Sequence, residues 1–293
     1  MEQMVRVDSE LCIGCKACLE VCPRDCFTIN EKNKSVFSSS LCHSCGHCIS
    51  VCTTDAIKHR DFAESEYPLV QDFLKDETVD GDQLFHLLRS IRSTRKYKKK
   101  PVPKKILEQL VDIGRLAPTG HHCQNVEMVI VDSPEIIQQL RDETAVAFRG
   151  FLKKIDNPFF RFIGKLVGKG DSIRKAQGSR ARFERMLAGF KVGTDYLFHE
   201  APVVLIFHAN TKSTVPLENC TIASNYMRIV GTGYGLGSCY IGYLVYASKY
   251  NSTIGEILNI PKENSIYQVM ILGYPKHPFR RFVARNPAKV LWK

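Results

Sequence analysis

The sequence lacks any long hydrophobic run. Its apolar block at 203–207 stops at His208, well short of the roughly 18 residues that a membrane-spanning helix needs. The first residues, Met1 to Met4, contain no apolar core of a secretory signal. The composition also lacks the bias toward charged residues that is typical of disordered proteins, because hydrophobic residues make up 44% of the chain and charged residues 24%. We therefore expect a folded cytoplasmic protein without a membrane span.

Cysteine is scarce in most of the chain. Only Cys123, Cys220 and Cys239 follow residue 52, whereas nine of the twelve cysteines precede residue 53. A disulfide scaffold needs an oxidising compartment, and nothing in the sequence indicates export. Clustered cysteines in an intracellular protein are more often metal ligands. The cysteine distribution therefore predicts a metal-binding segment at the N-terminus.

That segment contains an internal repeat. A shift of 30 residues places L-C-x-x-C-x-x-C-x-x-x-C at 11–22 on the same pattern at 41–52, and it also places Asp25 on Asp55. The repeat predicts a duplicated half-domain with a pseudo-two-fold relation. The remaining cysteine, Cys26, falls on Ala56, so we expect it to fill a small buried position rather than to bind metal.

The spacing of the repeated cysteines is typical of iron–sulfur proteins. Three thiolates three residues apart on a loop can hold three corners of a cubane cluster, whereas the fourth cysteine of the run ligates the other cluster. We therefore predict two [4Fe–4S] clusters, one held by Cys12, Cys15, Cys18 and Cys52 and the other by Cys42, Cys45, Cys48 and Cys22. The alternative is a pair of four-cysteine zinc sites, which usually join two C-x₂-C knuckles across a long spacer. Residues 1–60 resemble a bacterial-type ferredoxin with two [4Fe–4S] clusters.

Charge is unevenly distributed along the chain, which has a formal net charge of +11. Residues 1–60 are neutral, residues 61–80 carry −6 and residues 81–293 carry +17. Two clusters with four thiolates each shift the first segment to about −4, so an acidic electron carrier is joined to a basic domain. We expect residues 61–80 to form an ordered acidic connector on the surface. The basic excess suits an anionic partner such as a phosphorylated cofactor, a nucleic acid or an acidic protein.

Residues 81–293 show mixed periodicity that predicts an α+β domain. Helical spacing of apolar residues covers Leu84–Ile91 and Ile106–Ile113, and further helices are expected at 134–154, 181–199 and 220–230. Strands are expected at 126–131, 203–207 and 266–272. The whole chain is therefore expected to comprise a small ferredoxin domain at 1–60, the connector at 61–80 and an α+β domain at 81–293.

Four short segments of this domain indicate a cofactor site. Arg92, Ser93 and Arg95 offer two guanidinium groups and a hydroxyl that suit a phosphate monoester, although a basic helix end alone is usually a solvated surface. The others are the turn at 116–125, the glycine-rich run at 231–242 and Leu-Gly-Tyr-Pro at 272–275, which precedes a basic tail with Arg285. The glycine run follows a helix instead of a strand, so it is not a dinucleotide-binding fingerprint.

In this order and spacing the four segments resemble the nitroreductase family over about residues 84–292. The resemblance implies an α+β fold, an intertwined homodimer and FMN held at the dimer interface. It also implies cofactor-binding roles, with the phosphate held by Arg92, Ser93, Arg95 and Arg285, and the flavin ring contacted by Pro118, Thr119, Gly120, Gln124, Gly237, Ser238, Cys239, Ile241 and Gly242. The sequence departs from the family at His122 and Asn125, where the family usually has Asn and Pro. His122 is a candidate proton donor, with a structural histidine as the alternative.

The resulting hypothesis is a ferredoxin-coupled, FMN-dependent oxidoreductase. Electrons from the clusters, supplied by an external ferredoxin or another low-potential carrier, would reduce FMN and then a nitroaromatic, quinone or activated alkene. The alternatives are a redox-sensing or electron-transfer module without turnover and a nucleic-acid-binding iron–sulfur protein, although we do not expect a nucleic-acid partner. The aromatic and basic segment 159–169 is expected to be a mobile cover or a dimer element, with membrane contact as the alternative.

Overall fold

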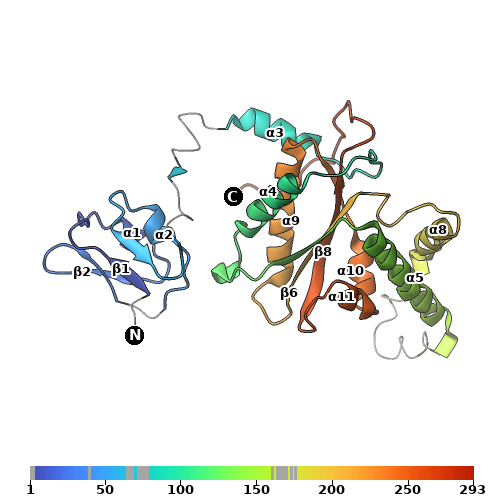
Figure 1. The fold of residues 1–293 in the computed structure, drawn as a ribbon, viewed down its shortest axis with the longest axis horizontal. Coiled ribbons are helices and arrows are strands. Elements are labelled where there is room, and N and C mark those ends of the chain that lie inside the picture. The colour runs from blue at the N-terminus through green and yellow to red at the C-terminus, as the bar shows by residue number, and fades with distance from the viewer. Residues whose placement is uncertain are drawn as a thin grey trace. The chain divides into compact units, whose positions relative to one another are not determined.

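The computed structural model describes residues 4–38, 41–63, 69–70, 79–159, 162, 171, 174 and 177–293. They form two units (Figure 1): the N-terminal unit groups residues of Met1–Asp80 with His121–Cys123, and the C-terminal unit comprises Gly81–Gly120 and Gln124–Lys293. Most of the expected connector at 61–80 and most of the segment at 159–169 lie outside the described residues. Within the described ranges, no helix is both long and apolar enough to cross a membrane.

The elements of the N-terminal unit repeat at the same interval of 30 residues as its cysteines. The first half comprises β1 (Val5–Val7), α1 (Ala17–Glu20) and β2 (Phe27–Ile29), and the second comprises β3 (Ser35–Phe37), α2 (His47–Ser50) and β4 (Ile57–His59). Strand β1 pairs antiparallel with β4, and β2 pairs antiparallel with β3. The outer strands of the two halves and the inner strands of the two halves therefore pair with one another, as a pseudo-two-fold relation requires.

Matched positions of the two halves have matched backbone and burial. Asp25 and Asp55 both adopt left-handed conformations, with φ of 49° and 52°. Cys26 and Ala56 are both 1% exposed. Cys26 therefore occupies the small buried position that the repeat predicts.

The C-terminal unit contains a four-stranded antiparallel sheet with the order β5-β6-β8-β7. Its strands are β5 (Glu127–Val131), β6 (Val203–Asn210), β7 (Gly237–Tyr240) and β8 (Asn264–Gly273). The described helices after residue 80 are α3 (Gly81–Ser90), α4 (Lys104–Arg115), the short 3₁₀ helix η3 (Gly120–His122), α5 (Pro134–Asp156), α8 (Arg180–Lys191), α9 (Pro216–Gly233), α10 (Gly242–Ser248) and α11 (Thr253–Ile257).

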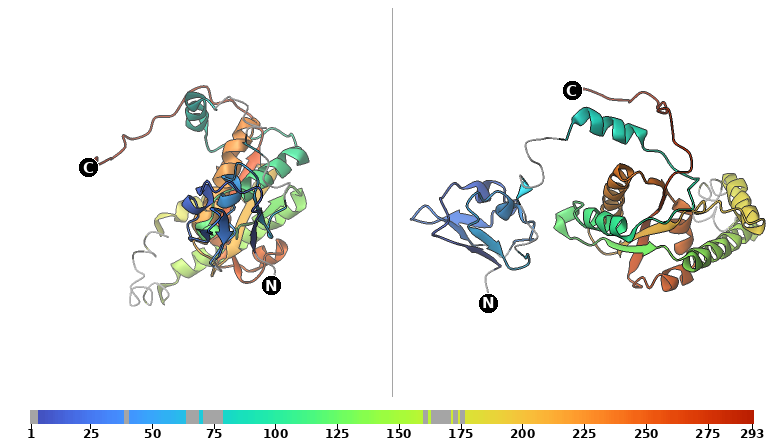
Figure 2. Two further views of the ribbon diagram at one scale, coloured as in Figure 1. Left: turned by 90° about the vertical axis from the view of Figure 1, so that its left-hand side faces the viewer. Right: turned by 45° about the horizontal axis from the view of Figure 1, so that its top comes forward.

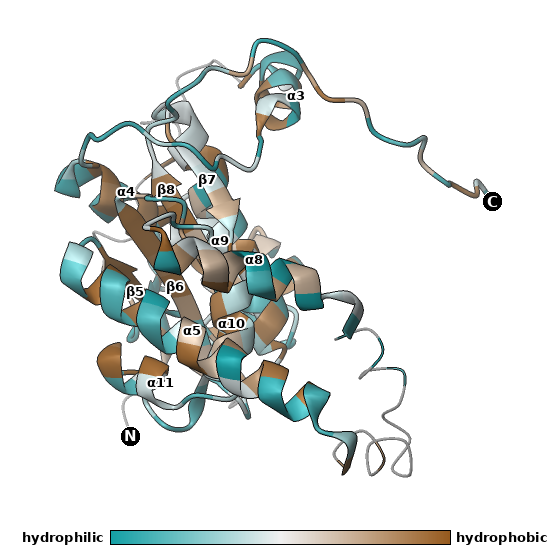
Figure 3. Cartoon of the chain, turned by 90° about the vertical axis from the view of Figure 1, so that its right-hand side faces the viewer, coloured by the Kyte–Doolittle hydropathy of each residue, from teal (hydrophilic) through white to brown (hydrophobic). Residues whose placement is uncertain are grey.

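Helices cover both faces of this sheet, so two apolar cores form (Figure 1). Strand β6 alternates between them, because Val204 and Ile206 face the core shared with α5, α10 and α11, whereas Leu205 and Phe207 face the core shared with α4 and α9. Figure 3 shows the apolar strands between these two helical layers. Burial on both faces explains why β6 is a nearly continuous apolar run in the sequence.

Most expected elements are present with small differences at their ends, but one helix is shorter than expected. The helix expected at 181–199 ends at Lys191 in α8. Gly193 has a φ of 74°, and the Asp195 carboxylate accepts hydrogen bonds from the N–H groups of Leu197, Phe198 and Glu200. These bonds stabilise a turn where the periodicity suggested helix. The expectation for residues 192–199 was therefore wrong.

Helix α3 and the C-terminal segment expose apolar side chains. No residue of α3 is buried, and Phe85 is 58% exposed. In both views of Figure 2 the C-terminal segment runs out from the body of its unit, and its Trp292 is 90% exposed. The Phe282 ring stacks on His86 at 5.9 Å and lies under the Arg89 guanidinium at 4.5 Å, which ties this segment to α3.

Candidate cofactor sites

The structure gathers cysteines from both repeats around one cavity of the N-terminal unit. Cys22 of the first run lines this cavity together with Cys42, Cys45 and Cys48 of the second run. This is the set that the crossed assignment requires for the second cluster. Cys22 follows α1, so the short helix directs the fourth cysteine of the first run toward the other run.

Backbone N–H groups donate to the cysteine sulfurs, as suits anionic thiolates. The N–H of Cys26 donates to Cys22 Sγ at 3.3 Å, and the N–H of Ala56 donates to the equivalent Cys52 Sγ at 3.3 Å. Cys12 Sγ accepts from the Ser35 N–H at 3.4 Å. Such bonds stabilise negative charge on sulfur, so this donor set fits iron–sulfur clusters with thiolate ligands.

Two of the central thiols are buried enough to disfavour the free thiolate. Burial raises the pKa of the Cys48 thiol to about 12, and it also raises the pKa of Cys18. A bound metal deprotonates such thiols outright. Among the described residues, no three His, Cys, Asp or Glu side chains form a group for a single metal ion.

In the C-terminal unit, three of the four sequence segments pack together. The Thr94 N–H donates to the Ser238 carbonyl at 2.9 Å, and Ser93 forms a bridge with Ser238 at the start of β7. Tyr97 forms a second bridge with Pro275. The chain from Arg92 to Tyr97 therefore lies between β7 and the segment that follows β8.

A pocket opens beside this junction. Four of its lining residues were expected to bind the flavin or its phosphate, namely Arg95, Cys239, Ile241 and Gly242. Sequence reasoning missed the others: Arg182, Arg185, Met186, Tyr196, Leu197, His199, Tyr240 and Tyr243. Most of the missed residues come from α8 and the turn after it, where no short motif marks them.

The charge in this pocket is positive. Arg95, Arg182 and Arg185 contribute guanidinium groups, and none of the lining residues is acidic. Burial lowers the pKa of His199, the Asp195 carboxylate acts in the opposite direction, and the positive charges of Arg95 and Lys96 lower the pKa further. His199 therefore favours the neutral form beside fixed positive charges, and the pocket suits an anionic group.

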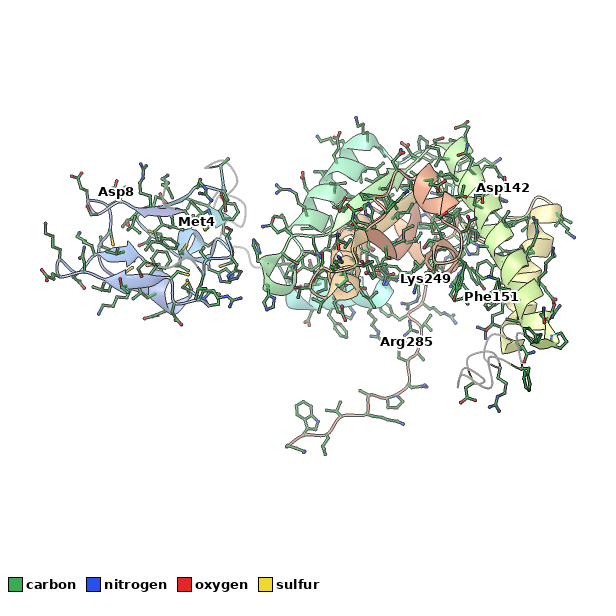
Figure 4. The ribbon with its side chains drawn as sticks, turned by 90° about the horizontal axis from the view of Figure 1, so that it is seen from below. Met4, Asp8, Asp142, Phe151, Lys249 and Arg285 are labelled. Atoms are coloured by element: carbon green, nitrogen blue, oxygen red, sulfur yellow. The ribbon has the colours of Figure 1, made fainter. Side chains whose placement is uncertain are left out.

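The remaining phosphate candidates are placed differently. Arg92 donates from Nη1 to the carbonyls of Arg89 and Ile91 at 2.7 Å each, while its buried Nε has no partner among the described residues. A buried guanidinium N–H of this kind can donate a hydrogen bond to a phosphate oxygen. Arg285 lies on the C-terminal segment, which extends away from the body of the unit (Figure 4). Its Nη1 donates to the Ala284 carbonyl at 3.2 Å.

The C-terminal unit holds four expected flavin contacts elsewhere, namely Pro118, Thr119, Gly120 and Gln124. Gly120 N–H donates to Asn219 Oδ1 at 3.0 Å, and Gln124 N–H donates to Thr119 Oγ1 at 3.0 Å. Asn219 is near the start of α9, whereas β7 follows the end of α9 at Gly233. At 1.5 Å per residue, these two ends are about 21 Å apart. Within a single chain, α9 therefore lies between the loop that contains Pro118, Thr119, Gly120 and Gln124 and the junction of Ser93 with Ser238.

His122 belongs to the same loop and is not among the residues that line the pocket. It adopts a left-handed conformation with a φ of 53°, and burial lowers its pKa.

Packing requires glycine at residue 237, because a Cβ atom there would lie 2.3 Å from Thr94 Oγ1.

Comparisons with known proteins found matches to both parts of the chain. A model of the nitroreductase family matches residues 88–274, and a model of the 4Fe–4S dicluster domain matches residues 11–56. An NADPH-dependent oxidoreductase of Staphylococcus saprophyticus is 31% identical over 199 residues, which are 67% of this chain and 66% of the relative. The match thus spans slightly less than two thirds of the relative's length.

Solved structures share the fold of the C-terminal unit. A nitroreductase with bound FMN from Bacteroides fragilis aligns with 74% of this chain and 100% of its own at 19% identity, with a TM-score of 0.55. A nitroreductase with bound FMN from Desulfitobacterium hafniense aligns with 71% of this chain and 98% of its own at 16% identity, with a TM-score of 0.52. The chain belongs to the nitroreductase family and carries a 4Fe–4S ferredoxin domain ahead of its nitroreductase domain.

Proposed function

We propose that this oxidoreductase binds FMN and two [4Fe–4S] clusters, and that electrons pass from the clusters to FMN and on to an organic acceptor. The domains would be the ferredoxin at 1–60, the connector at 61–80 and the flavin domain at 81–293. The observation that carries the proposal is the junction of Arg92–Tyr97 with β7 beside a cationic pocket, in a chain that also holds two iron–sulfur cysteine runs. Bound FMN supplies the ability to take electrons singly and to deliver them in pairs.

The FMN phosphate would be held by Arg92, Ser93 and Arg95. A charge-assisted hydrogen bond contributes about 1.5–3 kcal/mol, so Arg92→Ala should weaken FMN binding roughly 10- to 100-fold. FMN retention after dialysis measures this effect. Arg149→Ala, an exposed charge on α5, is the matched control. Equal retention in both variants would show that Arg92 does not contact the cofactor.

The acceptor would be a nitroaromatic, a quinone or an activated alkene. The pocket provides aromatic walls in Tyr196, Tyr240 and Tyr243, and it provides Arg182 and Arg185 beyond the groups assigned to the phosphate. Positive charge attracts a carboxylate or another anionic substituent. We therefore expect acceptors that carry a negative charge to be the better substrates.

The enzyme would act as a homodimer. The loop at 118–124 and the junction of Ser93 with Ser238 lie toward opposite ends of α9, so a second copy would supply one of these two parts to each flavin. The exposed apolar side chains of α3 and the C-terminal segment, which include Phe85 and Trp292, offer the surface that such a partner would cover.

Electron entry is tested with the full chain after anaerobic reconstitution. Its absorbance spectrum should contain both flavin and iron–sulfur bands, and a reduced ferredoxin should drive nitroaromatic or quinone reduction. The double variant Cys22→Ser/Cys52→Ser removes one ligand from each cluster, so it should keep FMN and lose most of this rate. An unchanged ferredoxin-driven rate would show that the clusters are not the inlet.

The relative's name makes NADPH the competing electron donor. If NADPH alone drives turnover equally well in the intact chain and in the double cysteine variant, hydride enters directly at the flavin. If neither donor supports turnover while both cofactors are bound and reduced, the chain is a redox sensor or an electron-transfer module without a small-molecule substrate.

A further inference from the structure

The second half of the ferredoxin repeat places a histidine against a cluster-binding cysteine. His59, on β4, is 4% exposed, and its Nε2 lies 3.9 Å from Cys42 Sγ. The His59 side chain lines the same cavity as Cys22, Cys42, Cys45 and Cys48. It therefore lies beside the proposed second cluster.

The surroundings of the ring determine which nitrogen carries its hydrogen. The backbone N–H of Asp61 donates to His59 Nδ1 at 3.1 Å, so Nδ1 is an acceptor in a neutral ring. The hydrogen is then on Nε2, where it points to sulfur. Phe62 packs on the imidazole with a ring separation of 4.8 Å and holds its orientation. The contact is thus an N–H···S hydrogen bond with a fixed donor.

The first half of the repeat has no equivalent of this donor. The 30-residue shift places His59 on Ile29, whose side chain carries no polar hydrogen. At the first cluster, Ser35 of β3 instead places its Oγ 3.2 Å from Cys18 Sγ. The two clusters therefore have different side-chain neighbours: a serine hydroxyl at the first and an imidazole at the second.

We propose that His59 is a positioning residue that acts through Cys42 and raises the reduction potential of the second cluster. The inference rests on the proposed binding of two clusters. Reduction adds one electron to a cluster with four thiolates and changes its net charge from about −2 to about −3, with no bond formed or broken. The Nε2–H group stays on His59 and stabilises the added negative charge through Cys42. Hydrogen bonds to sulfur are among the factors that set cluster potentials.

The test is a redox titration of the reconstituted full chain, followed by paramagnetic resonance. His59→Ile, which copies the first half, and His59→Phe, which keeps an aromatic ring beside Phe62, both remove the donor. Each should lower the equilibrium constant for one-electron reduction of one cluster about tenfold, which corresponds to about 59 mV, and leave the other cluster unchanged. His59→Gln retains an N–H donor and should restore most of the potential.

Ser35→Ala is the matched control, because it removes the neighbour of Cys18 and should lower the potential of the other cluster only. Ile29→His places an imidazole at the equivalent position of the first half and should raise the first cluster's potential. This variant keeps His59, so it tests the idea separately from the loss variants. Unchanged potentials, equal shifts at both clusters, or a shift of the same cluster by His59→Ile and Ser35→Ala would each contradict the proposal.

Iron content and absorbance separate this failure from failure of the proposed function. A wild-type chain that binds no iron–sulfur clusters would contradict the function itself. A chain that binds two clusters with potentials insensitive to residue 59 would contradict only the role of His59.

Discussion

At the scale of single residues, Gly237 shows how a cofactor motif can be needed for packing. The segment from Arg92 to Tyr97 crosses β7 so closely that a Cβ atom at residue 237 would lie 2.3 Å from Thr94 Oγ1 and 2.8 Å from Pro275 Cγ. Gly233, in the same glycine-rich run, has open space at its Cβ position. Glycines four residues apart therefore have different structural constraints.

Gly237→Ala should therefore destabilise the fold by about 1–3 kcal/mol, because the added methyl group must displace Thr94 or Pro275. Gly233→Ala adds the same methyl group inside α9 and should be neutral or stabilise by up to about 1 kcal/mol. Urea denaturation measured by circular dichroism compares the two variants. Equal stabilities would show that the close approach at Gly237 is absent in solution.

His208 gives the C-terminal unit a pH-dependent stability. It is 3% exposed on β6, its Nδ1 accepts a hydrogen bond from Asn264 Nδ2 at 2.9 Å, and burial lowers its pKa, with Glu127 acting in the opposite direction. A histidine whose pKa is lower when folded takes up its proton more readily when unfolded. The free energy of unfolding should therefore fall as the pH drops below about 6.5.

The measurement is urea denaturation at pH 7.5, 6.5 and 5.5, with His208→Gln as the comparison. The glutamine side chain can still accept a hydrogen bond from Asn264 but does not titrate. The variant should lose less stability on acidification than the native chain does. Parallel losses in both proteins would assign the pH dependence to other groups.

At the scale of elements, the cysteine repeat predicts local structure more completely than the apolar periodicity at 181–199 predicts the end of α8. Equal ligand spacing in both halves requires equal loops and helices, so the repeat extends to the strands and to left-handed positions such as Asp25 and Asp55. The end of α8 depends on Asp195, whose carboxylate stabilises the turn before β6 through contacts that periodicity does not encode. β7 was expected only as a glycine-rich run, and its strand conformation depends on pairing with β8.

The pocket residues show the same difference between local patterns, which the sequence reveals, and tertiary contacts, which it does not. Short motifs predicted Arg95, Cys239, Ile241 and Gly242, because these residues belong to local segments with a family pattern. Arg182 and Arg185 reach the pocket through the tertiary placement of α8, and their sequence is an ordinary basic helix. Element packing, rather than a motif, therefore brings these two charges to the pocket.

Removing the two α8 charges should change acceptor preference. Arg182→Ala/Arg185→Ala should reduce kcat/KM for 4-nitrobenzoate roughly three- to tenfold and leave nitrobenzene nearly unaffected, since exposed charges contribute about 1 kcal/mol. Lys191→Ala, at the end of the same helix and outside the pocket lining, is the control. Equal losses for both acceptors would contradict recognition of the carboxylate.

At the scale of the whole molecule, α9 separates two parts of one expected site. Its length of 18 residues places the loop at 118–124 near one end and the junction of Ser93 with Ser238 at the other. An arrangement of two chains can bring the loop of one protomer to the junction of its partner. The distance along α9 therefore predicts that each FMN contacts both protomers.

Subunit mixing tests this arrangement. The variant Arg92→Ala/Arg95→Ala damages the phosphate site, and the variant Thr119→Ala/Gln124→Ala damages the loop, so each homodimer alone should bind FMN poorly. In a mixed dimer, the native loop of the first variant meets the native Arg92 and Arg95 of the second, and one of the two sites is intact. Co-expression with two different affinity tags and tandem purification isolates the mixed dimers. These should regain about one FMN per dimer, because the two defects fall together in the other site. If both parts of the site came from one chain, every site in the mixed dimer would carry one defect and FMN content would stay low.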